Sequence, residues 1–270
     1  MKFNNRNVQV SPRATIGTNV RIGDNTVIYD NVVVEDNSII CNDCVIGEPL
    51  YDYYLDEDNY RNPVTRIGAG AMIRSHTIIY AGNEIGANFQ TGHRVTIREF
   101  AKFGANNMIG TLGDIQGYAE LGDFCRMQCN VHIGQATKLH DFVMVFPFTV
   151  FTNDPHPPSM VMRGAEVKSF SQVAVHCTML PDSIVGRGCL VGANSVVNRV
   201  YPDETIIVGS PAKAIGPIGK IRSQQEGFEG QPHYPWVHRF ARNMPWEAGK
   251  FADWARSQVD RYDIPEPWLS

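Results

Sequence analysis

The sequence predicts an all-β fold: a parallel β-helix of about nine coils, with two inserted loops and a partly helical C-terminal tail. The main observation is a period of six. Between Ile67 and Phe151 every sixth residue is large and apolar, apart from Thr91. This period fits neither an isolated helix nor an isolated strand, and it is typical of a solenoid in which three hexads close one coil of 18 residues. The second observation is that glycine or asparagine recurs between these apolar residues, where a sharp corner requires positive φ.

The hexads form three blocks, which are separated by two aperiodic loops. The blocks are Val10–Ile46, Ile67–Phe151 and Val167–Val197. The loops are residues 47–64, rich in tyrosine and acids, and residues 152–166, rich in proline. A solenoid tolerates such insertions because each coil contacts only its neighbours. We therefore predict one β-helix domain over residues 1–219.

The C-terminal extension, residues 220–270, has a different character. It contains all four tryptophans of the chain. One segment, residues 248–262, has apolar residues at helical spacing and predicts one short helix. Because a narrow prism has little surface on which to bury four tryptophans, we expect the tail to dock along the β-helix or on a neighbouring subunit.

The composition excludes several classes of protein. The chain has 270 residues, of which 43% are hydrophobic and 19% charged, and its net charge is −4. These values exclude a disordered chain, and the absence of a basic run argues against a nucleic-acid partner. The N-terminal segment is polar and no apolar run reaches the length of a membrane span, so we expect a cytoplasmic protein.

Six cysteines raise the question of a metal or redox site. They are Cys41, Cys44, Cys125, Cys129, Cys177 and Cys189. Cys41 and Cys44 have the CxxC spacing of zinc and redox sites. However, Cys44 lies two positions before a hexad apolar residue, where alanine, serine and threonine recur in other coils. A free thiol fits this interior position as a small apolar group, so we predict structural cysteines and no metal.

Three segments carry a resemblance to a known family: HTIIYAGNEIGANFQTGHRVTIRE (76–99), VFPFTVFTNDPHPPS (145–159) and VGSPAKAI (208–215). With the repeats, they resemble the hexapeptide-repeat acyltransferases, and most closely the bacterial N-acetyltransferases that act on nucleotide-linked amino sugars. The resemblance implies a left-handed β-helix and a homotrimer with active sites between subunits. It also implies acetyl-CoA as donor and a UDP- or dTDP-linked amino sugar as acceptor, for surface polysaccharide biosynthesis.

Other functions remain open on the same fold. One is an O- or N-acyltransferase with another small acceptor, and one is a non-enzymatic β-helix module. A third is a carbonic anhydrase, which holds zinc with three histidines. His76, His93 and His132 invite that interpretation, but their separations are not multiples of 18, so they do not form one column along the prism.

The catalytic candidates follow from what acyl transfer to an amine requires. The amine must lose a proton, which a positioned histidine can accept. His156 lies in the proline-rich NDPHPP loop, where Asn153 and Asp154 can orient its ring or bind the sugar. His132 precedes a hexad apolar residue and should point outward; its segment resembles the HxxHD-type motif of relatives in lipid A biosynthesis, although Gln135 replaces the second histidine. A mechanism without a protein base is the alternative.

Substrate contacts are expected from residues beside these histidines. We assign them to His93, Arg98, Glu99, Asn130 and Asp154, because the 18-residue spacing places Arg98 and Glu99 beside the exit to the second loop. Arginine matches the geometry of phosphate, and the tyrosines of the first loop can stack on a base or a sugar.

The coenzyme A site is assigned by resemblance alone. In the family, the exit that resembles VGSPAKAI lies near the coenzyme. The corresponding candidates are Ala193, Gly209, Pro211 and Lys213.

Overall fold

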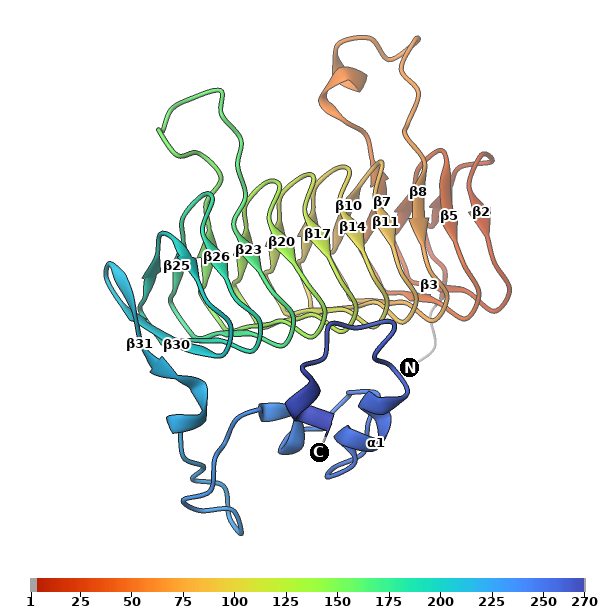
Figure 1. Ribbon diagram of the computed structural model, residues 1–270. Coiled ribbons are helices and arrows are strands. Elements are labelled where there is room, and N and C mark those ends of the chain that lie inside the picture. Colours follow the sequence, from red (N-terminus) through yellow and green to blue (C-terminus); the bar gives the residue numbers. More distant parts are fainter. Residues whose placement is uncertain (1–3, 270) are drawn as a thin grey trace.

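The computed structural model describes residues 4–269, which form a three-sided β-helix with a tail along one side (Figure 1). We call the three sheets faces A, B and C. Face A contains β1 (Gln9–Val10), β4 (Val27–Ile28), β7 (Val45–Glu48), β10 (Ile78–Tyr80), β13 (Thr96–Ile97), β16 (Asp114–Ile115), β19 (His132–Ile133), β22 (Val150–Phe151), β25 (Thr178–Met179) and β28 (Val196–Val197). Face B contains β2 (Thr15–Ile16), β5 (Val32–Val34), β8 (Thr65–Ile67), β11 (Glu84–Ile85), β14 (Lys102–Phe103), β17 (Glu120–Leu121), β20 (Lys138–Leu139), β23 (Glu166–Val167), β26 (Ile184–Val185) and β29 (Val200–Tyr201).

Face C is extended by a hairpin. It contains β3 (Arg21–Ile22), β6 (Ile39–Ile40), β9 (Met72–Ile73), β12 (Gln90–Thr91), β15 (Met108–Ile109), β18 (Arg126–Met127), β21 (Met144–Val145), β24 (Gln172–Val173), β27 (Leu190–Val191), β30 (Thr205–Gly209) and β31 (Ala212–Pro217). Only the β30–β31 pair of the described chain is antiparallel. Two faces have ten strands and the third has eleven, so the β-helix is longer than the nine coils expected. The extra strands were missed because buried Tyr201 follows Val197 after four residues and breaks the period of six.

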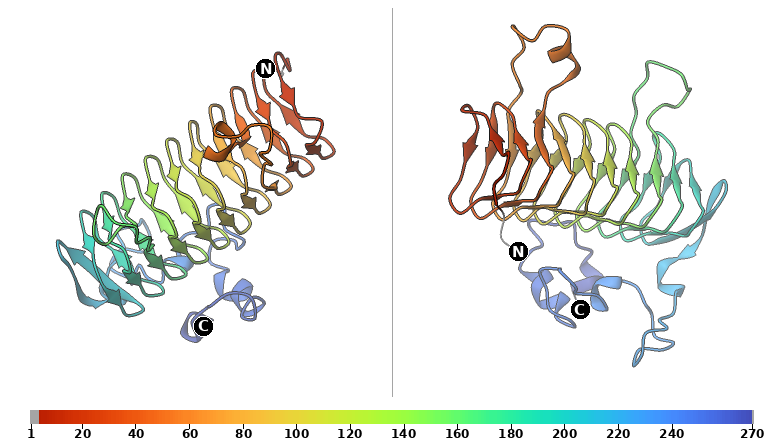
Figure 2. Two further views of the ribbon diagram at one scale, coloured as in Figure 1. Left: turned by 90° about the horizontal axis from the view of Figure 1, so that it is seen from above. Right: turned by 180° about the vertical axis from the view of Figure 1, so that it is seen from behind.

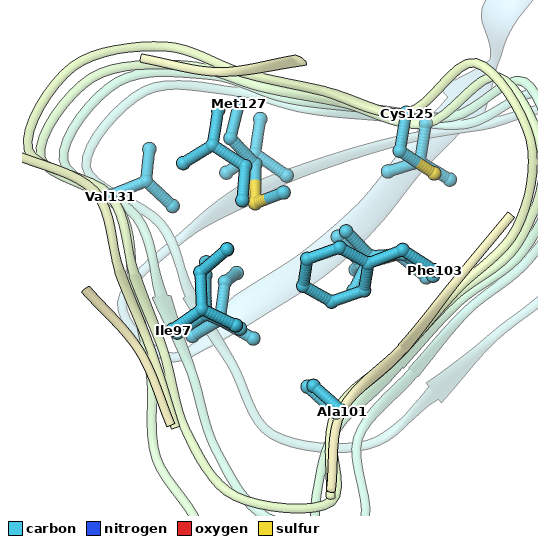
Figure 3. Packing of buried hydrophobic residues seen from close by; sticks show 14 of the residues in the cluster. Ile97, Ala101, Phe103, Cys125, Met127 and Val131 are labelled. Atoms are coloured by element: carbon cyan, nitrogen blue, oxygen red, sulfur yellow. The ribbon is translucent and has the colours of Figure 1, made fainter. Parts of the chain in front are cut away.

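The period of six arises from the packing of the interior. Figure 3 shows Ile97, Phe103 and Met127 pointing inward from the three faces, with the small residues Ala101 and Cys125 between them. Stacked coils place like residues above one another, as in the register Ile97↔Ile115 on face A. The predicted interior position is confirmed for the cysteines that precede a hexad apolar residue by two, since these are buried: Cys44, Cys125, Cys177 and Cys189. All six thiols are free. Burial raises the pKa of the Cys44 thiol to about 12, which keeps it protonated.

Thr91 is the exception in the apolar position, and its role is structural. Its side chain is buried, and its hydroxyl accepts a 2.8 Å hydrogen bond from the backbone N–H of Arg74. In neighbouring coils the corresponding N–H bonds a backbone carbonyl, as Gly92 does with Ile109. Between β9 and β12, paired at Gln90↔Met72, the hydroxyl of Thr91 therefore takes the place of a backbone acceptor.

Replacing Thr91 by valine should lower the free energy of unfolding by about 1–3 kcal/mol, because the Arg74 N–H loses its acceptor inside the protein. The matched control is Thr137→Val. Thr137 is also fully buried, but its hydroxyl has no hydrogen-bond partner among the described residues. Valine there should be neutral or stabilising. Urea unfolding followed by circular dichroism measures both changes, and equal losses for the two variants would contradict this account of Thr91.

The corners adopt the left-handed conformation expected, including the bulky ones. Phe124, Phe142 and Phe170 have φ of 59°, 61° and 64° and stack on one another along the edge between faces B and C. On this edge the chain's own tail covers the bulky corners: Phe142 is completely buried against Trp246 and Tyr262.

The tail therefore docks along its own β-helix, which was one of the two alternatives expected. It contains η2 (Ile218–Lys220), η3 (Trp236–His238), α1 (Phe251–Arg256) and η4 (Glu266–Leu269). The helix is shorter than the predicted segment 248–262 because α1 ends at Arg256, and Val259 is exposed rather than packed. None of the helices in residues 4–269 is long and apolar enough to cross a membrane.

Candidate active site on face A

Both inserted loops leave the β-helix at the same edge, where face A turns into face B. The first loop contains η1 (Tyr51–Tyr54) and joins β7 to β8, and the second joins β22 to β23. Figure 1 and the right-hand view of Figure 2 show the loops projecting on the side opposite to the tail. Five strand spacings separate β7 from β22, which corresponds to about 24 Å. The space between the loops on this edge is the candidate active site.

A histidine–aspartate pair lies on face A between the two loops. His132 and Asp114 are partners in the register of β19 and β16, and Nδ1 of His132 lies 2.9 Å from Oδ2 of Asp114. Gln116 donates to both oxygens of this carboxylate at 3.0 Å. The hydrogen bond with His132 lowers the pKa of Asp114, so the carboxylate is ionised at neutral pH. An ionised carboxylate accepts from an N–H at Nδ1, which leaves Nε2 of His132 as a proton acceptor.

Asp114 was not among the predicted site residues, although the sequence held a signal for it. It precedes His132 by 18 residues, which is one coil, and aspartate is unusual among the mainly apolar or hydroxyl residues of that outward row. Histidine and aspartate with half-exposed side chains, held together beside a loop edge, are the groups that general-base chemistry needs.

Arg98 and Glu99 lie on the loop edge, but they are paired with each other. Arg98 donates from Nε to Oε2 of Glu99 at 2.8 Å and from Nη2 to Oε1 at 3.2 Å. The guanidinium also lies over the ring of Tyr80, 4.7 Å from its centroid. To a substrate, the ion pair therefore presents hydrogen-bonding groups in fixed positions, and no uncompensated charge.

The second loop begins beside this edge and is folded by Asp154. Asn153 donates to Oε1 of Gln135 at 3.0 Å, which joins the loop to the coil below. The carboxylate of Asp154 accepts from the backbone N–H of His156 at 2.8 Å and from the backbone and hydroxyl of Ser159 at 2.6 Å. The Ser159 hydrogen bond lowers the pKa of Asp154. Asp154 thus shapes the loop, while His156 is exposed and its ring is bonded to neither Asp154 nor Asn153.

His93 and Asn130 lie on the other side of face A, at the edge shared with face C. His93 is exposed, and Asn130 is a half-buried corner residue with φ of 56°. The predicted catalytic and substrate residues thus flank face A on both edges, with His132 between them, rather than forming one cluster.

The four predicted coenzyme residues gather at the C-terminal end of the β-helix. Gly209 and Lys213 belong to the β30–β31 hairpin, with exposed Pro211 at its tip. Gly209 has φ of 102°, and its N–H donates to the hydroxyl of Ser195 at 3.1 Å, two residues from Ala193. On face A this end lies three strands beyond β19, or about 14 Å.

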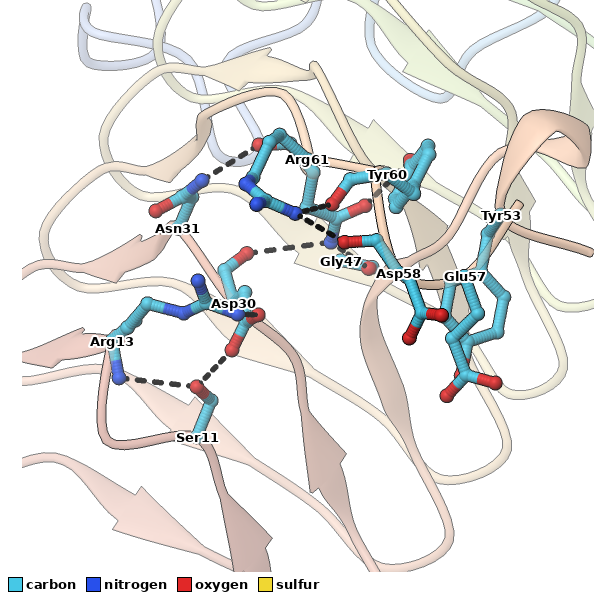
Figure 4. Close-up of polar contacts among 11 residues, drawn as sticks. Ser11, Arg13, Asp30, Asn31, Gly47, Tyr53, Glu57, Asp58, Tyr60 and Arg61 are labelled. Atoms are coloured by element: carbon cyan, nitrogen blue, oxygen red, sulfur yellow. Dashed lines mark hydrogen bonds and ion pairs between the residues drawn. The ribbon is translucent and has the colours of Figure 1, made fainter.

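A cleft of about 770 Å³ lies between the first loop and the N-terminal coils (Figure 4). Tyr53 and Tyr60 line it and meet edge to face, with ring centroids 5.6 Å apart. Asp30 forms an ion pair with Arg13 on the facing coil. Strands β1 and β4 contribute to the cleft, so it adjoins the same face A that carries His132. Aromatic rings beside paired charges suit a polyhydroxylated ligand, which presents apolar ring faces and hydroxyls.

The histidines of the zinc hypothesis are not brought together. Across residues 4–269, no three His, Cys, Asp or Glu side chains are grouped so as to hold a metal ion.

Known proteins share the repeat and the fold. Residues 13–48 match the family model "Bacterial transferase hexapeptide (six repeats)". A Mycobacterium tuberculosis protein named "Probable acetyltransferase Rv3034c" is 26% identical over 156 residues, which are 55% of this chain and 48% of that protein. An Escherichia coli (strain K12) protein named "Putative lipopolysaccharide biosynthesis O-acetyl transferase WbbJ" is 55% identical over 38 residues, 14% of this chain and 19% of that one. The chain thus matches about half of the first relative and about a fifth of the second.

The structural comparison concerns the whole chain. The UDP-N-acetylglucosamine acyltransferase of Arabidopsis superposes with a TM-score of 0.52 at 14% identity, and the alignment covers 98% of this chain and 92% of that one. At this identity the match shows the fold alone. Residues 13–48 thus match the bacterial hexapeptide transferase repeat, and the chain as a whole shares the left-handed β-helix fold of the Arabidopsis acyltransferase.

Proposed function

We propose that this protein is an acetyl-CoA-dependent N-acetyltransferase that acts on a UDP- or dTDP-linked amino sugar for surface polysaccharide biosynthesis. The observation that carries the proposal is the His132–Asp114 pair on face A, between two loops that leave the same edge. The names of the relatives, an acetyltransferase and a lipopolysaccharide O-acetyl transferase, support acyl transfer to a sugar.

In the proposed reaction, His132 acts as general base. Its Nε2 takes a proton from the acceptor amine as the nitrogen attacks the thioester carbonyl. The C–N bond forms, the C–S bond breaks, and the proton passes to the departing thiolate of coenzyme A. Asp114 holds the imidazole through Nδ1 and stabilises its protonated form.

The surrounding residues would position the two substrates. Arg98, Glu99 and Asn153 present hydrogen-bonding groups on the loop edge, and His156 and His93 are exposed enough to contact an acceptor. The tyrosine cleft would take the remote part of the acceptor. The hairpin at Gly209 and Lys213 would hold coenzyme A, with its thioester directed along face A toward His132.

We also propose a homotrimer, in which a neighbouring subunit closes face A and completes the site. Face A supports this because its outward row is largely apolar and yet half-buried rather than buried, with Val150 exposed. Light scattering of the purified protein measures the oligomer directly, and a monomer mass would contradict this part of the proposal.

The experiment that tests the activity is a screen of nucleotide-linked amino sugars with acetyl-CoA, following release of free thiol. We expect one UDP- or dTDP-linked amino sugar to release thiol stoichiometrically with product. The second candidate function, O-acetylation of a sugar hydroxyl, is favoured by the name of the Escherichia coli relative. Matched sugars that carry a hydroxyl in place of the amine distinguish the two. No thiol release with either series would contradict sugar acetylation.

A further inference from the structure

A groove of about 620 Å³ runs between face C and the tail, away from the candidate active site. Its floor comes from five successive strands, β15, β18, β21, β24 and β27, whose outward residues include Met108, Met144 and Leu190. Its wall comes from the tail, where Trp236 and Phe240 face the floor. Because the tail forms one side, the groove exists only when the tail is docked.

Arginines line the groove, and no carboxylate does. Arg126 projects from β18, and Arg239 and Arg242 come from the tail. Arg126 donates to the backbone oxygen of Asn243 at 3.4 Å, and Arg239 donates to Oε1 of Gln231 at 2.9 Å. Within residues 4–269, none of the three arginines forms an ion pair with an aspartate or glutamate.

Arg126 and Arg242 are close enough to repel. Burial, and then the positive charge of Arg242, lowers the pKa of Arg126. Both guanidinium groups line the same groove, Arg126 half-buried and Arg242 exposed, and an anion bound in the groove would offset their repulsion. Phosphate is the anion that matches two guanidinium forks best.

The shape of the groove indicates an elongated ligand. Five strands span about 19 Å, and Arg126 lies in the second of them. Beyond it the floor continues through Met144 and Leu190, with Gln172 between them. Methionine side chains are flexible and adapt to chains of variable shape. The charge therefore lies near one end of a mainly apolar track.

We propose that this groove binds a single-chain lipid phosphate, with the phosphate between Arg126 and Arg242 and the alkyl chain along Met144 and Leu190. The site lies on a different face from His132, and the proposal does not depend on the acetyltransferase activity. It assigns the tail a function beyond covering the phenylalanine edge.

Calorimetric titration of the full chain with dodecyl phosphate, below its critical micelle concentration, tests the proposal. We expect saturable binding of one molecule per chain, with a change in tryptophan fluorescence because Trp236 lines the groove. Dodecyl maltoside has the same chain with an uncharged head and should bind at least about tenfold more weakly; hexyl phosphate should also bind more weakly. Equal affinity for the maltoside, or for the short chain, would overturn the proposal.

Variants locate the site. Arg126→Gln with Arg242→Gln should weaken dodecyl phosphate binding by about tenfold or more. The charge-matched control, Arg66→Gln with Lys102→Gln on face B, should bind as the unaltered protein does. Because Arg126 also contacts the tail, the ligand series on the unaltered protein gives an answer independent of folding. Unchanged binding in the Arg126/Arg242 variant, or full displacement by coenzyme A, would refute a lipid phosphate site.

Discussion

Replacing His132 by glutamine should lower the rate of acyl transfer by about 100-fold or more, the usual contribution of a positioned general base. Glutamine fills similar space on face A but cannot accept a proton at neutral pH. The binding of acetyl-CoA should change little, because the proposed coenzyme residues lie about 14 Å away along the β-helix. Initial rates of thiol release, with kcat and KM separated, measure the effect.

Two other histidines serve as matched controls. His156→Ala should lower the rate by about tenfold through weaker positioning of the acceptor, since Asp154 is hydrogen-bonded to the backbone N–H of His156 rather than to its imidazole. His93→Gln should have a smaller effect than His132→Gln. If His132→Gln keeps the normal rate while His156→Ala loses it, the base is in the loop. If neither matters, the acceptor amine sheds its proton without a protein base.

The pair also gives a direction for pH dependence. The pKa of Asp114 is lowered in the folded protein, so its stabilising interaction with His132 is fully present above the ordinary aspartate pKa. The interaction is lost only as the pH falls through the lowered value. Asp114→Asn should therefore make the free energy of unfolding depend less on pH in the acidic range. Because Asp114 stabilises the protonated form of His132, the same change should reduce kcat more than it raises KM.

Phe142→Ala should lower the stability of the docked tail by about 3–5 kcal/mol. Phe142 is completely buried, with Phe124 and Phe170 stacked on its two sides at 5.0 and 4.8 Å. Its ring also meets Trp246 and Tyr262 of the tail. The β-helix should survive, because its interior forms a separate apolar cluster. We expect protease cleavage within the tail, exposed tryptophan fluorescence and an unchanged far-ultraviolet spectrum.

Phe148→Ala is the matched control for that experiment. Phe148 has the same corner conformation, with φ of 60°, but it is 48% exposed and its ring stacks on His176 at 5.0 Å rather than on the tail. Its loss should leave the tail protected. Equal protease sensitivity of the two variants, or a protected tail in Phe142→Ala, would contradict the docking role of Phe142.

The fold was largely predictable because each six-residue repeat corresponds to one strand of a coil. Ile97, Phe103 and Met127 could be assigned to the interior from their spacing alone. Spacing also held the His132–Asp114 contact, since residues 18 apart are neighbours on adjacent strands. The period fails after Val197, where the additional strand β29 ends at Tyr201 only four residues later, and this strand was not predicted.

The remaining differences come from contacts that no period encodes. Asp154 was expected to orient the ring of His156 or to bind the sugar, and its carboxylate also folds the loop through Ser159. Thr91 interrupts the apolar period because its hydroxyl replaces a backbone acceptor for the N–H of Arg74. Phe142 lies under the tail because of tertiary packing between segments about a hundred residues apart, which local sequence does not specify.

The two loops leave one edge of a structure that grows only by whole coils. Their separation, five strands from β7 to β22, can therefore change only in steps of about 4.8 Å, each requiring the gain or loss of one complete turn of chain. A shorter insertion or deletion within the coils, unless it is looped out as the two loops are, rotates the following side chains to another face. The distance along the β-helix between the tyrosine cleft and His132 can therefore evolve only in whole-coil steps. Relatives that act on substrates of different length should differ in this segment by multiples of 18 residues.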